Sequence, residues 1–363
     1  MQKVLLCTFL FATLFSLSSS AQVYLNKDSS LTLSGYADGY YAYYTDSVGA
    51  GNFQKFPTTA ARSNSFGLNI AMLGLKYTTD KLRAVITLHY GDIPLSAWAS
   101  KYNNIQEAYA GVRISKKLWA DIGFFRTHID AESALPKENI TASVTVATYH
   151  EPYYEAGARL SYKPNSKLSF DLYVLNGYNL YEDNNDKKSF GLLATYACND
   201  ALSIGYSNYI GSNAERGDSI SRFRNYENVF LNYQKKRIKM QAGFNFCNQR
   251  NADTLQNSTA NLFSGFATAR YSVCSKAGVY ARGEFFNDAS GFLSGSFTDK
   301  INRTTGVKLW GVTVGTEFKP TENSYIRLEG RELQCEKNQQ IFRWRGTNKS
   351  NRSEIIFLTG IYF

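Results

Sequence analysis

The sequence predicts an all-β protein: a transmembrane, antiparallel, up-and-down β-barrel of about 16 strands, with roughly 14 to 18 compatible with the pattern. Blocks of about ten residues alternate apolar and polar side chains, which is the period of a β-strand. Short turns and long polar connections alternate between these blocks. After residue 21, no stretch approaches the roughly 18 uncharged apolar residues that a transmembrane helix needs. Any membrane-spanning structure must therefore be a barrel.

The first 21 residues are predicted to be a signal peptide, and residues 22–363 a single outer-membrane barrel domain. Lys3 precedes an apolar run from Val4 to Leu17, which is short for a membrane span. Residues 18–21 are small (Ser, Ser, Ser, Ala), as a signal peptidase requires. We therefore expect an exported chain that is integral to the outer membrane of a Gram-negative cell.

The alternation of side chains sets the position of each strand. In the block 167–178, the even positions from Leu168 to Val174 are apolar, while the odd positions from Ser169 to Tyr173 carry polar groups. A soluble secreted β-sandwich also buries one apolar face, so alternation alone leaves that alternative open. The predicted strands are 31–44, 64–77, 81–91, 104–114, 117–127, 154–163, 167–178, 187–197, 201–211, 225–234, 238–248, 260–273, 277–287, 305–318, 323–335 and 353–363.

The connections favour the barrel over the sandwich. Outer-membrane barrels have short periplasmic turns and long external loops, and single-chain bacterial barrels have an even number of strands. Here short turns at 78–80, 115–117, 163–166, 198–200, 235–237, 274–276 and 320–323 alternate with long polar stretches at 45–63, 91–103, 128–153, 179–186, 211–224, 249–259, 287–303 and 336–352. This parity places both termini of the barrel in the periplasm.

The net charge and the cysteine pattern of the sequence limit the partners, metals and cofactors that the protein is expected to bind. The formal net charge of +10 raises nucleic acid as a partner. The basic residues are scattered through the predicted strands, and a secretory signal separates the chain from nucleic acid, so we expect no such partner. The sequence has no Cys-x-x-Cys motif and no Cys/His cluster, so no metal and no cofactor are expected. A lumen that favours anions fits the positive charge.

Aromatic residues mark the two ends of the predicted barrel. The last strand, 353–363, places Phe357, Ile361 and the C-terminal Phe363 on one face. Such a strand resembles the signal read by the barrel insertion machinery, so we expect that machinery and outer-membrane lipid as partners. The first strand contains tyrosines that fit either an interfacial girdle or a sugar-stacking platform, namely Tyr36, Tyr40, Tyr41, Tyr43 and Tyr44.

A family resemblance is carried by residues 107–191. These residues contain Glu107-Ala108, Gly123-Phe-Phe-Arg-Thr127, Glu132, Asn139, Ser143, Pro152, Gly157, Leu175-Asn-Gly-Tyr178 and Asp183-Asn-Asn-Asp-Lys-Lys-Ser189. With them the chain resembles the β-barrel porin-2 family of OmpL-like outer-membrane porins, and the resemblance implies a pore. Asp130 stands where a Gly is expected before Glu132, so we expect this turn to differ. A barrel of about sixteen strands leaves an aqueous channel, so a passive channel for small hydrophilic solutes is the expected function.

The third external loop, 128–153, is the longest, and in large porins such a loop commonly folds inward and narrows the pore. Residues 141–149 alternate, but strand parity forbids a membrane pass there, so we expect them against the inner wall. We expect the loop to carry Asp130, Glu132 and Glu138 into the channel, where opposed charges create a field that screens solutes. The wall residues expected to line the pore are Arg83, Arg113, Arg159, Arg282, Arg327 and Arg331. The alternative is that these arginines form a structural ladder of salt bridges, and both can hold together.

Catalysis is not expected. An outer-membrane phospholipase-like enzyme needs a Ser two residues after a His on one strand face, and none of His89, His128 and His150 is followed by Ser at that offset. The alternative function is a surface-display barrel that acts as an adhesin or receptor through its long external loops. The sequence is compatible with a monomer and with a homotrimer.

Overall fold

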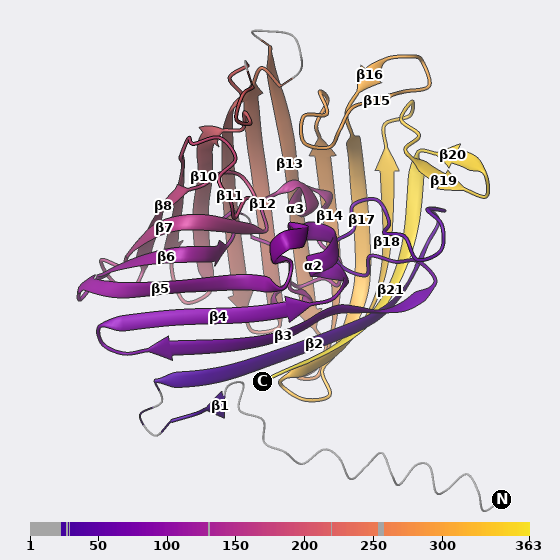
Figure 1. Ribbon diagram of the computed structural model, residues 1–363. Helices are drawn as coiled ribbons and strands as arrows, with labels where there is room; N and C mark the ends of the chain where they lie inside the picture. The colour runs from indigo at the N-terminus through magenta and orange to yellow at the C-terminus, as the bar shows by residue number, and fades with distance from the viewer. Residues whose placement is uncertain (1–22, 27, 29, 130, 219, 253–257) are drawn as a thin grey trace, which may run out of the picture.

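The computed structural model describes residues 23–26, 28, 30–129, 131–218, 220–252 and 258–363. Within these residues the chain forms a closed antiparallel β-barrel of sixteen strands, which confirms the predicted fold class (Figure 1). Each barrel strand pairs with its neighbours in chain order, and the last strand pairs with the first to close the barrel. The predicted signal peptide, residues 1–21, lies outside the described residues.

Every strand boundary lies within three residues of its predicted position. The barrel strands are β2 (Leu31–Tyr44), β3 (Ser65–Thr78), β4 (Leu82–Tyr90), β5 (Ile105–Ser115), β6 (Leu118–Arg126), β7 (Tyr154–Tyr162), β8 (Leu168–Leu175), β9 (Ser189–Ala197), β10 (Leu202–Ser212), β11 (Phe223–Lys235), β12 (Ile238–Arg250), β13 (Thr259–Ser272), β14 (Ala277–Asn287), β17 (Lys308–Phe318), β18 (Ser324–Cys335) and β21 (Asn351–Tyr362). A two-residue strand, β1 (Val23–Tyr24), pairs with the start of β2.

The two faces of the wall differ in polarity because successive side chains of a strand point to opposite faces. In β14, Val279 and Phe285 point outward and remain 46% and 43% exposed. Tyr280, Arg282 and Glu284 of the same strand point inward and are buried. An apolar outer face and a polar inner face are what a strand between lipid and an aqueous lumen requires.

The tyrosines of β2 divide between the two faces. Tyr36, Tyr40 and Tyr44 point inward and are buried, whereas Tyr41 and Tyr43 point outward. All three inward hydroxyls form hydrogen bonds with protein groups. The inward rings are therefore fixed parts of the packing, while the outward rings face the side expected to contact lipid.

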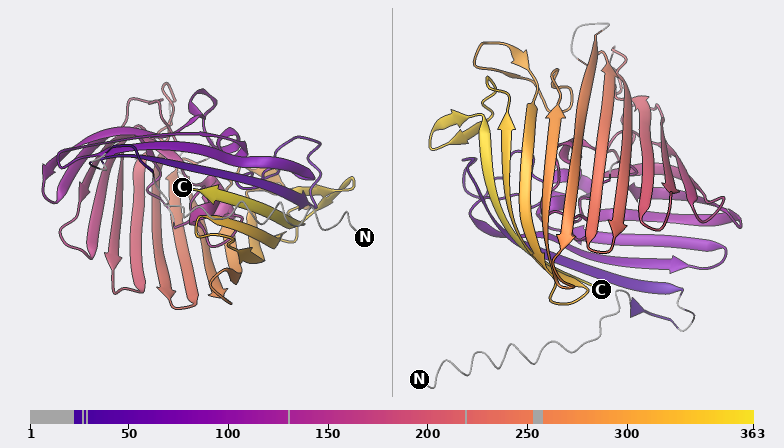
Figure 2. Two further views of the ribbon diagram at one scale, coloured as in Figure 1. Left: turned by 90° about the horizontal axis from the view of Figure 1, so that it is seen from below. Right: turned by 180° about the vertical axis from the view of Figure 1, so that it is seen from behind.

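The remaining elements lie in the long connections. They are α2 (Asp92–Ala97), η1 (Ser100–Tyr102), η2 (Pro136–Glu138), α3 (Val146–His150), the hairpin of β15 (Phe297–Thr298) with β16 (Thr304–Thr305), and the hairpin of β19 (Phe342–Trp344) with β20 (Thr347–Lys349). Figure 2 shows both hairpins at the end of the barrel opposite the C-terminus. Among the described residues, no helix has the length and apolar character needed to cross a membrane.

Two buried clusters join the long connections to the inner face of the wall. In the first, Leu135 packs with Ile93 of α2 and with the inward Tyr325 of β18. In the second, Val146 of α3 packs with the inward Phe286 of β14. The connections are therefore held by apolar contacts as well as by the polar contacts described next.

Candidate functional site

The connection between β6 and β7, residues 127–153, is named the β6–β7 segment. Its side chains are largely buried, and Figure 1 shows its helix α3 beside β14. The Thr145 hydroxyl caps α3 by accepting a hydrogen bond from the Thr148 amide at 3.3 Å. The alternation of residues 141–149 is thus interrupted by a helical turn, because this cap starts a helix at Val146.

Two glycines lie where the β6–β7 segment joins the wall. Gly123 of β6 lies directly opposite Gly157 of β7. A Cβ atom at Gly123 would lie 2.3 Å from the carbonyl oxygen of Ala108, and one at Gly157 would lie 1.9 Å from that of Val174. Gly123 also has a φ of 140°, which favours glycine. Close backbone approach therefore explains why both positions are glycine in the stretch that carries the family resemblance.

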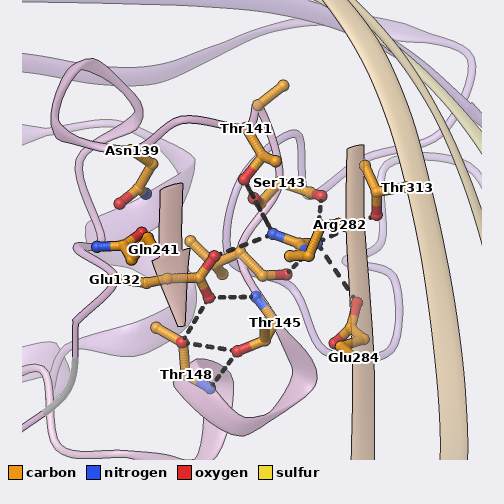
Figure 3. A network of polar contacts seen from close by, with 12 residues as sticks. Glu132, Asn139, Thr141, Ser143, Thr145, Thr148, Gln241, Arg282, Glu284 and Thr313 are labelled. Carbon is orange, nitrogen blue, oxygen red and sulfur yellow. Dashed lines mark hydrogen bonds and ion pairs between the residues drawn. The ribbon is translucent and has the colours of Figure 1, made fainter. Parts of the chain in front are cut away.

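Arg282 of β14 makes a dense set of contacts with the segment (Figure 3). Its Nη1 atom donates to Glu132 Oε1 at 3.0 Å, to the Thr141 hydroxyl at 2.9 Å and to the Ser143 carbonyl at 2.7 Å. Glu132 Oε2 accepts from the Thr145 amide at 2.8 Å. A buried ion pair is tolerated only when its remaining polar atoms are also satisfied. Removing Arg282 would therefore take this cation from the buried Glu132 carboxylate, whereas removing Glu132 would leave Arg282 with Glu284, at 3.4 Å, as its ion-pair partner among the described residues.

Two charged residues of β18 bind the backbone of the segment. Arg327 donates to three carbonyl oxygens at 2.7 to 2.9 Å, and Glu329 accepts from two amides at 2.7 and 3.1 Å. Both point inward because they are two residues apart in one strand. The segment residues in these contacts are Pro136, Asn139, Thr141, Ala142 and Ser143. These two side chains of the wall thus hold the segment in place by hydrogen bonds to its backbone.

The acidic partners that these arginines find on the wall itself, Glu284 and Glu317, were absent from the sequence prediction. Glu284 accepts from Arg331 at 2.6 Å and from the Val146 amide at 2.8 Å. Glu317 binds Arg327 at 2.7 Å. A signal was available in the sequence: opposite charges two residues apart, as in Arg282 and Glu284, share one face of a strand.

The other predicted arginines lie on a different part of the wall. Arg83 and Arg159 both bind Asp121 of β6, the latter at 2.9 Å. The Arg113 guanidinium lies 4.8 Å from the centre of the Trp119 ring. Among the described residues, none of the three arginines forms a hydrogen bond or ion pair with the β6–β7 segment.

The acidic residues predicted for the loop have separate surroundings. Glu132 meets Arg282, whereas Glu138 pairs with Arg126 at the end of β6, at 3.1 Å, and not with a predicted arginine. Burial alone would raise the pKa of Glu138, but the Arg126 guanidinium outweighs burial and holds that pKa below its usual range. Asp130 lies outside the described residues.

Two cavities meet at the end of the β6–β7 segment. The outer cavity, of about 1010 Å³, lies among the long connections and is lined by Phe56, Tyr149, Tyr178 and Arg224, among others. The inner cavity, of about 420 Å³, lies between the segment and the wall and is lined by Glu107, Arg126, Arg159, Asp171 and Tyr173, among others. Glu151 and Tyr153 line both cavities.

The boundary between the cavities is firmly held. The Glu151 carboxylate accepts from the Tyr226 hydroxyl at 2.5 Å and from the Asn245 amide at 2.6 Å. The Tyr153 hydroxyl lies 3.1 Å from that of Thr58, and burial raises the pKa of Tyr153 well above its usual value. A neutral ring and a fixed carboxylate therefore border both spaces where they meet. In the described part of the chain, no group of three or more His, Cys, Asp or Glu side chains is placed to hold a metal ion.

A closed sixteen-stranded barrel, apolar outside and charged inside, defines an outer-membrane β-barrel channel of the porin type. The chain belongs to the family described as "Putative beta-barrel porin-2, OmpL-like", whose model matches residues 30–363. The match extends the resemblance seen at 107–191 to the whole barrel. The family and the fold are those of non-enzymatic channels.

Solved porin structures share this fold at low sequence identity. A loop-deletion form of OmpT, an outer membrane protein of Vibrio cholerae, has a TM-score of 0.60 at 11% identity and covers 95% of this chain and 100% of that chain. The outer membrane channel DcaP of Acinetobacter baumannii has a TM-score of 0.60 at 9% identity, with 92% and 97% covered. OmpF of Salmonella typhi, in complex with daunomycin, has a TM-score of 0.60 at 11% identity, with 94% and 100% covered. One in-vitro folded OmpT structure is a trimer form. No curated protein matches the chain.

Proposed function

We propose that the protein is a passive porin, an aqueous channel for small hydrophilic solutes, and that the β6–β7 segment folds into its lumen as the constriction. The observation that carries this proposal is the binding of the segment backbone by inward-facing charges, above all by Arg327 and Glu329. A segment held in this way narrows a lumen without sealing it. The two cavities that meet at Glu151 and Tyr153 are the spaces through which a solute would pass.

The lining of the inner cavity supports selection by charge as well as by size. Arg126 and Arg159 contribute positive charge to this space, while five carboxylates contribute negative charge, namely those of Glu107, Glu132, Glu138, Glu151 and Asp171. Fixed charges of both signs across a narrow passage create a transverse field that orients and sorts solutes. The alternative role of the arginines, a structural ladder of salt bridges, is compatible with this arrangement, since Asp121 pairs with Arg159 beside the cavity.

We further propose that the channel favours anions. The short turns between strands carry nine basic residues and three acidic ones. The basic residues are Lys81, Lys116, Lys117, Lys163, Lys167, Lys236, Arg237, Lys276 and Lys319, and the acidic residues are Asp80, Asp200 and Glu322. Excess positive charge around one mouth raises the local concentration of anions.

Export and assembly belong to the same proposal. Residues 1–21 serve as the signal peptide, and the strand ending at Phe363 is read by the insertion machinery. Its support is the position of Phe363, whose ring lies over Gly35 of β2 where the barrel closes and whose side chain remains exposed. A homotrimer is the assembly suggested by the trimer form of OmpT, and cross-linking of the detergent-solubilised protein tests it.

Conductance in planar bilayers tests the channel. The purified protein should give stepwise, ohmic currents, and a salt gradient should give a zero-current potential of the sign set by anion flow. A protein that inserts but stays silent would contradict the pore and favour the surface-display barrel. A cation-selective current would contradict only the anion preference.

Two variants test the constriction. Glu132→Ala removes the carboxylate bound by Arg282, and Arg327→Ala removes the contacts with three backbone carbonyls. Both should raise single-channel conductance and change ion selectivity, because each releases the segment from the wall. Unchanged conductance and selectivity in both variants would contradict the constriction.

A further inference from the structure

A group of like charges lies on the inner face near the short turns. Lys239 of β12 lies directly opposite Arg270 of β13. Both point inward, on the faces that also carry Gln241 and Thr268. Like charges directly opposite each other destabilise a sheet. The pair therefore needs a compensating negative charge close by.

Arg270 reaches one carboxylate by crossing a neighbouring strand. Its Nη2 atom lies 2.8 Å from Oε1 of Glu317 on β17, beyond β14. The residue of β14 beneath it is Gly278, where a Cβ atom would lie 2.8 Å from Arg270 Nε. That Nε atom is buried and has no hydrogen-bond acceptor among the described residues. Burial keeps this Nε atom from a solute, so the donor that remains is Nη1, which forms no hydrogen bond or ion pair among the described residues.

Glu317 cannot balance the charge around it. It also binds Arg327 at 2.7 Å and lies 3.8 Å from Lys319, so one carboxylate serves three cations. Lys239 forms no ion pair within the described residues. Arg327 is further engaged with the backbone of the β6–β7 segment. The unbalanced positive charge is therefore centred on Lys239, Arg270 and Lys319.

We propose that Lys239, Arg270 and Lys319 form a binding site for a small divalent oxyanion of the phosphate type. A permeating solute would occupy this site near the end of the barrel that carries the short turns. A guanidinium and two lysine ammonium groups supply charge-assisted hydrogen-bond donors that phosphate oxygens accept. The site is reachable, since the side chains of Arg270 and Lys319 are 16% and 35% exposed. As a transit site it rests on the proposed porin function, although binding itself does not require conduction.

Calorimetric titration of the refolded barrel with inorganic phosphate tests the site directly. A sugar-based detergent without phospholipid excludes lipid headgroups as the bound phosphate. We expect saturable binding that Lys239→Gln weakens by about tenfold, as loss of one charge-assisted contact would. Lys235→Gln is the matched control, because Lys235 has the same charge at the same end of the barrel but on the opposite face of the wall. Absence of saturable binding, or equal weakening by both variants, would overturn the site.

A second measurement separates this site from the proposed porin function. In planar bilayers, phosphate should reduce the chloride current of the parent protein and of Lys235→Gln, but much less that of Lys239→Gln. A conducting channel without phosphate binding would overturn the site and leave the porin standing. A protein that conducts no current but binds phosphate in a Lys239-dependent way would overturn the porin and leave the site standing. Heat-modifiable migration on gels confirms that each variant has folded.

Discussion

Two parts of the wall use inward arginines in different ways. On β14 and β18, Arg282 and Arg327 have side chains that are only 0% and 3% exposed, and both bind the β6–β7 segment. On β4 and β7, Arg83 and Arg159 remain 21% and 16% exposed and share Asp121. The first part of the wall holds the segment, while the second leaves its arginines partly exposed, and Arg159 lines the inner cavity.

The difference indicates that one group of arginines fixes the position of the β6–β7 segment, while another group sets the electric field in the lumen. Burying a guanidinium costs several kcal/mol unless its donors are satisfied, and the contacts of both Nη atoms of Arg282 provide most of that satisfaction, with only Nε lacking an acceptor among the described residues. A partly exposed guanidinium costs less to place and still contributes charge to the space before it. Substitutions on the two parts of the wall should therefore have different consequences.

The largest effect is expected from Arg282→Met. The variant leaves Glu132 and Glu284 buried without this cation, a change that typically costs about 3–5 kcal/mol. Methionine keeps much of the volume, so the loss is mainly electrostatic. We expect the segment to detach, which should raise single-channel conductance and current noise and expose residues 127–153 to added protease.

The double variant Arg282→Met with Glu132→Gln is the control for this interpretation. Neutralising Glu132 removes one of the two carboxylates that lost the Arg282 cation, and Glu284 keeps its contact with Arg331, so part of the protease resistance should return. A double variant as sensitive as the single variant would show that the ion pair does not position the segment. Protease resistance of the single variant equal to that of the parent protein would contradict the anchoring role altogether.

A smaller effect of a different kind is expected from Arg159→Gln. It removes positive charge from the inner cavity while Asp121 keeps its contact with Arg83. We expect ion selectivity to shift toward cations by about twofold, because the local field changes by one charge. The protease pattern of residues 127–153 should stay as in the parent protein. Increased cleavage in Arg159→Gln would contradict the separation between the two parts of the wall.

The barrel could be predicted because its signals are local. Alternation and the parity of the connections act within one strand and its turns, and β14 was predicted at both ends. The errors have local causes that the pattern did not include. The strand predicted over 167–178 ends at Leu175, where the Asn176 side chain bonds the Tyr181 carbonyl at 2.9 Å. The strand predicted from 305 starts at Lys308, because Thr304 and Thr305 pair with β15.

The site was less predictable because its contacts join distant parts of the chain. Opposed charges on the loop and the wall were expected, and Glu132 does meet Arg282, 150 residues away in sequence. The pairing of Glu138 with Arg126 and the binding of backbone groups by Arg327 and Glu329 depend on the path of the segment in space. No periodicity in the sequence encodes that path.

The start of the β6–β7 segment offers a test by pH. His128 Nδ1 lies 2.8 Å from the Glu155 carboxylate, and its Nε2 lies 2.7 Å from the Asn208 carbonyl oxygen. A neutral imidazole has one N–H group, so only the protonated ring satisfies both acceptors. Burial alone would lower the pKa of His128, but the charge of Glu155 outweighs burial and raises that pKa above its usual 6.5.

The smallest effect on the anchoring of the β6–β7 segment is therefore expected when the pH is raised. A pKa that is raised by folding contributes stability that is complete below about pH 6.5 and is lost as the pH rises through the folded value. Current noise and cleavage of residues 127–153 should then increase with pH, though less than in Arg282→Met, because only one end of the segment loosens. His128→Gln keeps an amide donor and does not titrate, so it should remove this dependence. An equal alkaline rise in His128→Gln would assign the effect to other groups and refute the role of His128.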